Sequence, residues 1–137
     1  FFGGLAGNAG LFSTARDVAR VYQMLLNGGE IDGQRYLSKE TCQLFTTETS
    51  KISRRGLGFD KPDADDPKKG NCAPAAPAGV YGHTGFTGTC AWVDPMNELV
   101  YVFLSNRIYP DVTNRKLNQL HIRERIQGAI YDAMKKK

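Results

Sequence analysis

The sequence predicts an α+β fold, in which an antiparallel sheet is flanked by helices. Three observations indicate this fold: an amphipathic helical pattern near the start, two neighbouring runs rich in β-branched and aromatic residues, and a second helical pattern at the C-terminal end. The chain has 137 residues, 41% hydrophobic and 23% charged, which is enough for one domain with a buried core.

The first helix is predicted within residues 13–29. Thr14 can cap its N-terminus, with Asp17 three residues later, and Gly28 and Gly29 supply a left-handed stop. Between these signals the apolar residues follow the helical period and form one face: Val18, Val21, Tyr22 and Leu25.

Two shorter elements are predicted next. A turn is expected at Asp32 and Gly33, and Ser38 is expected to cap a short helix that ends at about Phe45. Residues 56–59, with the sequence GLGF, are compatible with a short strand.

Residues 60–79 form a long segment without a predicted helix or strand. They hold four of the six prolines and almost nothing that could pack. A structureless stretch of about 20 residues is unusual in a compact domain, so this segment is either a flexible functional flap or a variable insertion. Too little chain lies on either side for a domain boundary, and residues 1–137 are treated as one unit.

A β-hairpin is predicted from residues 81–93 and 98–105, turned by the sequence DPMN. The second arm is nearly all apolar, so both of its faces should be covered and a helix should lie on it. The final segment supplies that helix, with one apolar face made by Ile122, Ile126, Ala129, Ile130 and Ala133.

Charge and length argue against two classes of partner. The net charge of +4 owes much to the terminal lysines and to Lys68 and Lys69, and the basic residues form no stripe interleaved with aromatics, so no nucleic-acid partner is expected. The longest apolar run, Leu99–Leu104, has the length of a strand, so no membrane span is expected.

The cysteines and histidines argue against a metal site. Cys42, Cys72 and Cys90 are widely spaced and odd in number, which favours free, buried thiols over a single disulfide. The two histidines, His83 and His121, are too few for a three-histidine zinc site.

The tripeptide His83–Thr84–Gly85 at the start of the hairpin is the main candidate for chemistry. It offers a proton-handling imidazole, a hydroxyl and a residue without a side chain. Alone, these three residues favour the simpler interpretation, an edge strand whose glycines solve a packing problem. The competing hypothesis is an open edge along which a substrate lies.

Three segments together resemble the C-terminal part of serine β-lactamase-like proteins, the group of class C β-lactamases, esterases and penicillin-binding proteins. They are GLAGNAGLFSTARDVARVYQMLLNGG, YGHTGFTGTCAWVDP and VYVFLSNRIYP. The glycine-rich start and FLSNR are especially similar to β-lactamase-like modules fused behind bacterial family 3 glycoside hydrolases. The resemblance implies a β-lactamase/transpeptidase-like fold, a small-molecule or peptide acyl substrate, no cofactor, and a periplasmic or cell-envelope location.

The resemblance also implies roles for single residues. In that family a triad of Lys or His, Ser or Thr, then Gly flanks the catalytic serine, and its match here is His83, Thr84 and Gly85. The resemblance further implies that Phe86 offers its backbone N–H to the oxyanion hole.

The family's nucleophile motif is absent. No serine has a lysine three residues later, and no tyrosine has an asparagine two residues later, whereas in the family both motifs lie upstream of this segment. The chain is therefore expected to be an inactive C-terminal fragment that carries one wall of an active site. Its expected partners are the missing N-terminal half and a second copy through self-association. The alternative is a non-catalytic module that binds peptide or cell-wall material.

Overall fold

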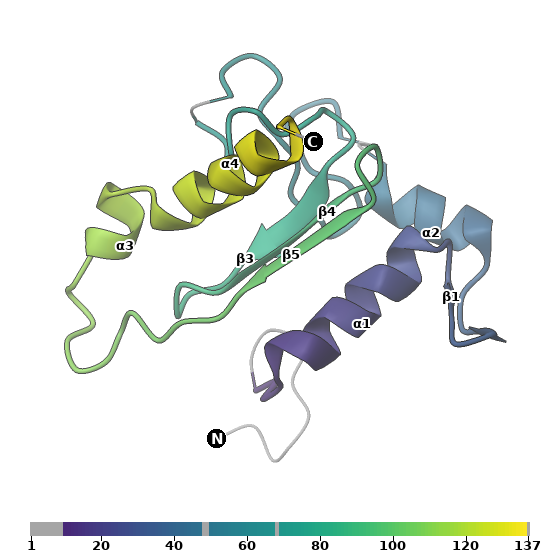
Figure 1. The fold of residues 1–137 in the computed structure, drawn as a ribbon, viewed down its shortest axis with the longest axis horizontal. Helices are drawn as coiled ribbons and strands as arrows, with labels where there is room; N and C mark the ends of the chain where they lie inside the picture. The colour runs from purple at the N-terminus through teal and green to yellow at the C-terminus, as the bar shows by residue number, and fades with distance from the viewer. Residues whose placement is uncertain (1–9, 48–49, 68, 137) are drawn as a thin grey trace.

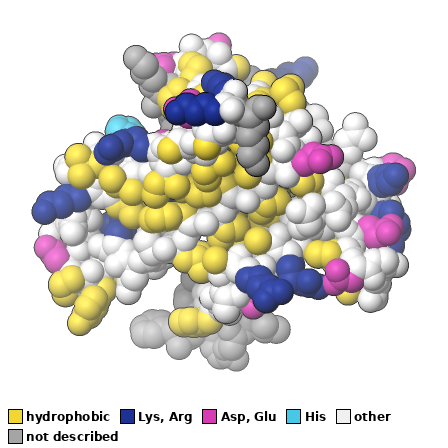
Figure 2. All heavy atoms as spheres, in the orientation of Figure 1, with side chains coloured by type: hydrophobic (Ala, Val, Ile, Leu, Met, Phe, Trp, Pro, Cys, Tyr) yellow, Lys and Arg dark blue, Asp and Glu magenta, His cyan; other side chains and the backbone are white. Residues whose placement is uncertain are grey.

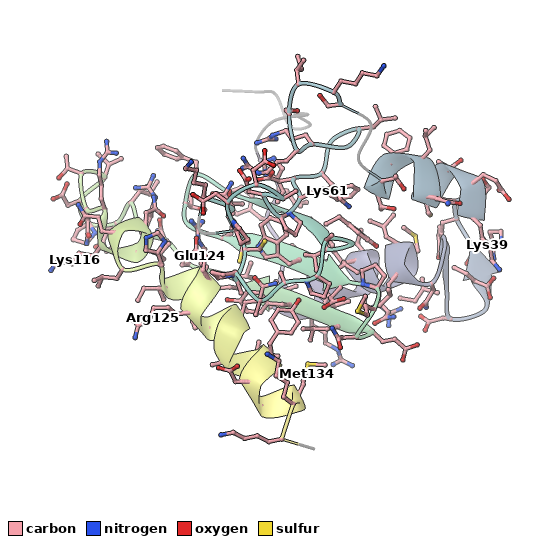
Figure 3. All side chains as sticks on the ribbon, turned by 90° about the horizontal axis from the view of Figure 1, so that it is seen from above. Lys39, Lys61, Lys116, Glu124, Arg125 and Met134 are labelled. Carbon is pink, nitrogen blue, oxygen red and sulfur yellow. The ribbon has the colours of Figure 1, made fainter. Side chains whose placement is uncertain are left out.

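The fold is a small antiparallel sheet between two helices. The computed structural model describes residues 10–47, 50–67 and 69–136. Its central sheet has the strand order β3 (Tyr81–Thr84), β4 (Cys90–Asp94), β5 (Leu99–Phe103). Helix α1 (Ala15–Leu26) lies on one face of this sheet and α4 (Ile122–Met134) on the other (Figures 1 and 3). The predicted α+β class is confirmed.

Helix α1 begins and ends where the sequence predicts. The Thr14 side chain accepts a hydrogen bond from the Asp17 amide at 3.2 Å, which satisfies a free N–H of the first turn. The helix stops at Gly28 and Gly29, whose φ angles are +68° and +94°. A Cβ on Gly29 would lie 2.2 Å from the Leu37 carbonyl oxygen, so only glycine fits there.

The next two elements also match the prediction. Strands β1 (Glu30–Ile31) and β2 (Gln34–Arg35) pair around Asp32–Gly33, where both φ angles are positive. Helix α2 (Lys39–Thr46) follows, and the Ser38 side chain caps it by accepting from the Thr41 amide. The predicted strand at residues 56–59 does not form, because this stretch makes only a tight turn.

The predicted hairpin contains three strands instead of two. Residues 81–93 were expected to form one arm, but a turn over residues 85–89 divides them into β3 and β4. The Gly85 amide donates to the Thr89 carbonyl at 2.8 Å, and Gly88 has a φ of +94°, which allows the chain to reverse. The second turn, at residues 95–98, lies where the sequence predicts it.

The core lies between the sheet and α4. Its buried cluster contains Cys90 and Trp92 of β4, Tyr101 of β5, and Val80, and Ile130 of α4 packs against it. The segment of residues 60–79 also contributes Cys72 to this cluster. The expectation that almost nothing in that segment packs is therefore wrong, although it contains no helix or strand in its described part.

Helix α4 turns a different face to the core from the one predicted. Its buried residues are Arg123, Gln127 and Tyr131, whereas Ala129 and Ala133 are exposed and Ile126 is 38% exposed. Among the predicted residues, Ile130 packs on the core and Ile122 is half-buried.

The inward face of α4 is stabilised by hydrogen bonds. The Tyr131 hydroxyl donates to Asp94 Oδ2 at 2.9 Å, and Gln127 Oε1 accepts from the Ala73 amide at 2.8 Å. These bonds satisfy buried polar groups, and for this reason polar residues occupy the buried face. None of the helices described is long and apolar enough to cross a membrane.

Candidate functional site

Strand β3 lies at the edge of the central sheet. Its inner side pairs with β4, and on its outer side Gly82 exchanges two backbone hydrogen bonds with Asp60, at 2.7 and 3.0 Å. Backbone groups of an antiparallel strand alternate in direction, so the Thr84 amide also points outward, whereas Phe86 lies in the turn that follows β3. Within the described part of the chain, the Phe86 amide donates no hydrogen bond.

The glycines of this edge are explained by packing inside the chain. A Cβ on Gly82 would lie 2.1 Å from the Ala91 carbonyl oxygen, and one on Gly85 would lie 2.3 Å from the Thr89 hydroxyl. Both distances are far below a normal contact. Gly82 is therefore needed whether or not a ligand approaches this edge, because its close neighbour is backbone. The neighbour of Gly85 is a side-chain hydroxyl that can rotate away, so packing explains Gly85 less strictly.

The His83 ring is held by two hydrogen bonds. An arginine can only donate and a carbonyl oxygen can only accept, so the roles of both partners are fixed. Arg55 Nη1 donates to His83 Nε2 at 2.9 Å, and His83 Nδ1–H donates to the Thr84 carbonyl at 2.7 Å. The ring is therefore the neutral tautomer with its proton on Nδ1, and Nε2 is the acceptor.

His83 and Thr84 point to opposite faces of the sheet. His83 is paired with Ala91 and Thr84 with Cys90, and neighbouring residues of a strand alternate between faces. Cys90 belongs to the core cluster beneath α4, so Thr84 lies on that side and His83 on the α1 side.

A cavity of about 440 Å³ opens on the α4 side of this edge. Thr84, Gly85 and Phe86 line it, but His83 does not. The Arg107 guanidinium also lines it and lies 4.9 Å above the Phe86 ring, whose residue is 70% exposed. The predicted site residues are thus contiguous in the chain but divided between two faces.

Asp60 anchors the chain that runs beside β3. Its side chain is buried, and it accepts from Arg54 Nη2 at 3.0 Å and from Asn71 Nδ2 at 2.7 Å. Burial alone would raise the pKa of this carboxyl, but the hydrogen bonds from Arg54 and Asn71 outweigh it and hold the pKa below its usual value. The carboxylate thus ties residues 54 and 71 to the edge next to His83.

The described cysteines are poor nucleophiles. Cys42, Cys72 and Cys90 are free and buried, as predicted. Burial raises the pKa of Cys72 to about 12 and that of Cys90 to about 11, so both thiols stay protonated at neutral pH.

Sequence reasoning missed Arg55, the partner of His83. Arg55 is 28 residues from His83 in the chain, and no local pattern joins the two. Arg107 belongs to the FLSNR segment, which was noted for its resemblance, but its position over Phe86 follows only from the fold.

Comparison with known proteins decides the family. The family model described as Beta-lactamase matches residues 2–124. The chain belongs to the β-lactamase family. The resemblance drawn from the three sequence segments is therefore confirmed.

The related proteins are bacterial. A putative D-alanyl-D-alanine carboxypeptidase of Escherichia coli O157:H7 is 36% identical over 116 residues, which are 85% of this chain and 26% of that protein. The protein of the same name in Salmonella agona strain SL483 is 36% identical over 122 residues, or 85% of this chain and 27% of that protein. This β-lactamase-family chain thus spans about a quarter of the length of these relatives.

A solved structure supports the fold. It is a penicillin-binding protein homologue from Caulobacter crescentus, with a TM-score of 0.51 and 24% identity. The match covers 65% of this chain and 24% of the solved one.

Proposed function

We propose that this chain forms one wall of the active site of a serine hydrolase, within a longer protein whose nucleophile comes from residues outside the chain. The observation that carries the proposal is the Phe86 amide, which makes no hydrogen bond within the described part of the chain and lies in the turn directly after His83–Thr84–Gly85 at the end of β3. Family membership and the relatives named as carboxypeptidases support acyl chemistry at this edge.

The proposed reaction is hydrolysis through a covalent acyl-enzyme. The serine oxygen attacks the substrate carbonyl, and the oxygen that becomes negative accepts a hydrogen bond from the Phe86 amide. Collapse of this intermediate expels the leaving group, and water then releases the acid. The proposed substrate is a peptide or another small acyl compound.

His83 is proposed to act through Nε2 on the α1 side of the edge. Its Nδ1–H is bound to the Thr84 carbonyl, so Nε2 is the atom that can exchange a hydrogen bond or a proton, once its bond from Arg55 is released. Arg55, which now binds Nε2, places a positive charge beside it. Such a charge would favour a negatively charged reaction centre.

The nucleophile is proposed to lie outside these 137 residues, because no Ser-x-x-Lys motif occurs among them. We therefore expect the isolated chain to turn over neither nitrocefin nor p-nitrophenyl acetate, since removal of a nucleophile forfeits covalent catalysis. The check is a spectrophotometric assay with His83→Ala as the matched variant. Turnover that this change abolishes would contradict the proposal.

A non-catalytic module that binds peptide or cell-wall material is the competing function. It predicts the same inactivity of the isolated chain, so the coding sequence upstream must discriminate. Ser-x-x-Lys and Tyr-x-Asn motifs there support the hydrolase, and their loss supports the binding module.

A further inference from the structure

The cavity on the α4 side of β3 contains a buried pair of charged residues that the proposed hydrolase does not use. We propose that this cavity is a binding site for a small carboxylate that carries a hydrogen-bond donor next to its carboxyl group, as hydroxy acids and amino acids do. The site is formed by Arg123 and Glu124 of the first turn of α4, with Lys69 and Arg107 at its other walls.

Arg123 is a buried cation in the wall of the cavity. Its side chain is only 8% exposed, and its Nη2 donates to Asn118 Oδ1 at 3.1 Å. Its Nε is buried and has no hydrogen-bond partner among the described residues. A buried donor of a charged group is costly to leave unpaired, so an unpaired donor on a residue that lines a cavity indicates that a ligand brings the acceptor.

Glu124 is a mostly buried carboxylate in the wall of the same cavity. Its side chain is 11% exposed and lies between α4 and the sheet, whereas Arg125 lies on the outer side (Figure 3). Its Oε1 is 3.9 Å from Arg123 Nη2, too far for a hydrogen bond, and its Oε2 is buried without a partner in the described part of the chain. The ligand should therefore also bring a donor.

The walls of the cavity carry more positive than negative charge. Lys69, Arg107 and Arg123 are positive and Glu124 is negative, so the cavity favours an anion. The Glu124 carboxylate would repel the second charge of a phosphate dianion, and it favours a ligand with a single negative charge. A carboxylate with an adjacent hydroxyl or amine satisfies Arg123 and Glu124 together.

The test titrates lactate into the isolated chain and measures its binding from the NMR chemical shifts of the backbone amides. Propionate lacks the hydroxyl donor and lactamide lacks the charge, so each removes one of the two features. We expect lactate to shift the amides of residues 84–86 and 118–124 and to bind several-fold more tightly than propionate, with lactamide weaker still. Equal binding of all three, or no shift at these residues, would overturn the proposal.

Variants localise the binding. Arg123→Gln should weaken lactate binding about tenfold or more, because a charge-assisted hydrogen bond is lost. Glu124→Ala should remove the preference for lactate over propionate. Lys69→Gln keeps the buried residues intact and should weaken binding only a few-fold. This effect should be smaller at high salt, because salt screens the charge of Lys69. The exposed Lys51 lies outside the cavity, so Lys51→Gln is the matched control and should change nothing.

The mode in which lactate inhibits the complete parent protein distinguishes two sources of the carboxylate. Competitive inhibition of acyl hydrolysis by lactate would assign the site to an end of the substrate, and non-competitive inhibition would assign it to a separate small acid. Lactate binding to the isolated chain does not depend on hydrolase activity. The proposed carboxylate site can therefore be confirmed even if the proposed hydrolase function is refuted.

Discussion

Two hydrogen-bond partners fix the His83 imidazole as one tautomer. One partner is close to His83 in the sequence and the other is distant. The Thr84 carbonyl belongs to the next residue in the sequence, and Arg55 comes from the irregular segment before Asp60. Both bonds leave the ring neutral and aim Nε2 toward a cation. The hydrogen-bonding state of His83 in this family member thus depends on a residue outside the His-Thr-Gly triad.

Replacement of Arg55 tests this arrangement. Arg55→Ala removes the donor to Nε2, so the ring should begin to exchange between its two neutral tautomers. Imidazole ¹⁵N chemical shifts at a pH above the titration of histidine measure this directly, and Arg16→Ala, an exposed change on α1, is the control. Nitrogen shifts that show the proton on Nε2 in the unaltered chain would contradict the assignment.

Local signals were predicted well from the sequence and distant contacts were not. The Thr14 and Ser38 caps depend on a backbone amide three residues away, so spacing alone identifies them. The pair of His83 and Arg55 depends on how the chain folds between them, which no periodicity encodes. The opposite directions of His83 and Thr84 follow from strand geometry but required the register of β3 and β4.

The segment of residues 60–79 is held in place by a buried carboxylate at its start. Asp60 pairs with Gly82 through the backbone, and its side chain binds Arg54 and Asn71. Lys61 is buried next to it and donates from Nζ to the Thr46 carbonyl. The segment is therefore fixed to the sheet at its first residues, despite its content of proline and glycine.

The pH dependence of stability tests the role of Asp60. Its pKa is lower in the folded chain than the ordinary 3.8, so the folded state favours the ionised form. The stability that Asp60 contributes is complete above the unfolded value and is lost as pH falls through the lower, folded value. Asp60→Asn should therefore cost about 1 to 3 kcal/mol near neutral pH.

Urea unfolding at a series of pH values measures this effect. The difference in unfolding free energy between the unaltered chain and Asp60→Asn should shrink as the solution becomes more acidic than pH 3.8. Asp65, which is exposed and lies in the same segment, offers the control Asp65→Asn. A difference that stays constant across this range would show that the carboxylate charge does not stabilise the fold.

Helix α4 shows where apolar periodicity gives the wrong answer. A helix in the final segment was predicted, but the apolar stripe through Ile126, Ala129 and Ala133 is not the buried face. The helix instead buries polar groups that bond to Asp94 and to the Ala73 backbone. Those partners come from a strand end and from the long segment, and neither could be assigned to α4 from the sequence.

The molecule as a whole exposes much apolar surface. Figure 2 shows hydrophobic side chains gathered over the sheet between α1 and α4, where the edge of the sheet faces the viewer. Leu104, which directly follows β5, is 44% exposed, and Phe12 and Ile52 are almost fully exposed. Free strand edges and apolar patches recruit other chains.

Self-association of the isolated chain is the expected consequence. Light scattering over a range of concentrations should show dimers or larger species, and Leu104→Lys should shift the distribution toward the monomer by placing a charge at the end of β5. Leu120→Lys, a change at an exposed leucine at the end of α3 (Lys116–Gln119), is the control. A strict monomer at high concentration would contradict this expectation.

The central claim is that the edge of β3 takes part in acyl hydrolysis in the complete parent protein, and turnover of its His83→Ala variant tests it most directly. We predict a fall of about 10² to 10³ in kcat with little change in KM, because the lost interaction acts in the transition state. Thr84→Val should lower kcat less, since one neutral hydrogen bond contributes about 1 kcal/mol. Melting temperatures of both variants should stay near that of the unaltered protein. A folded His83→Ala protein with unchanged kcat would contradict the claim.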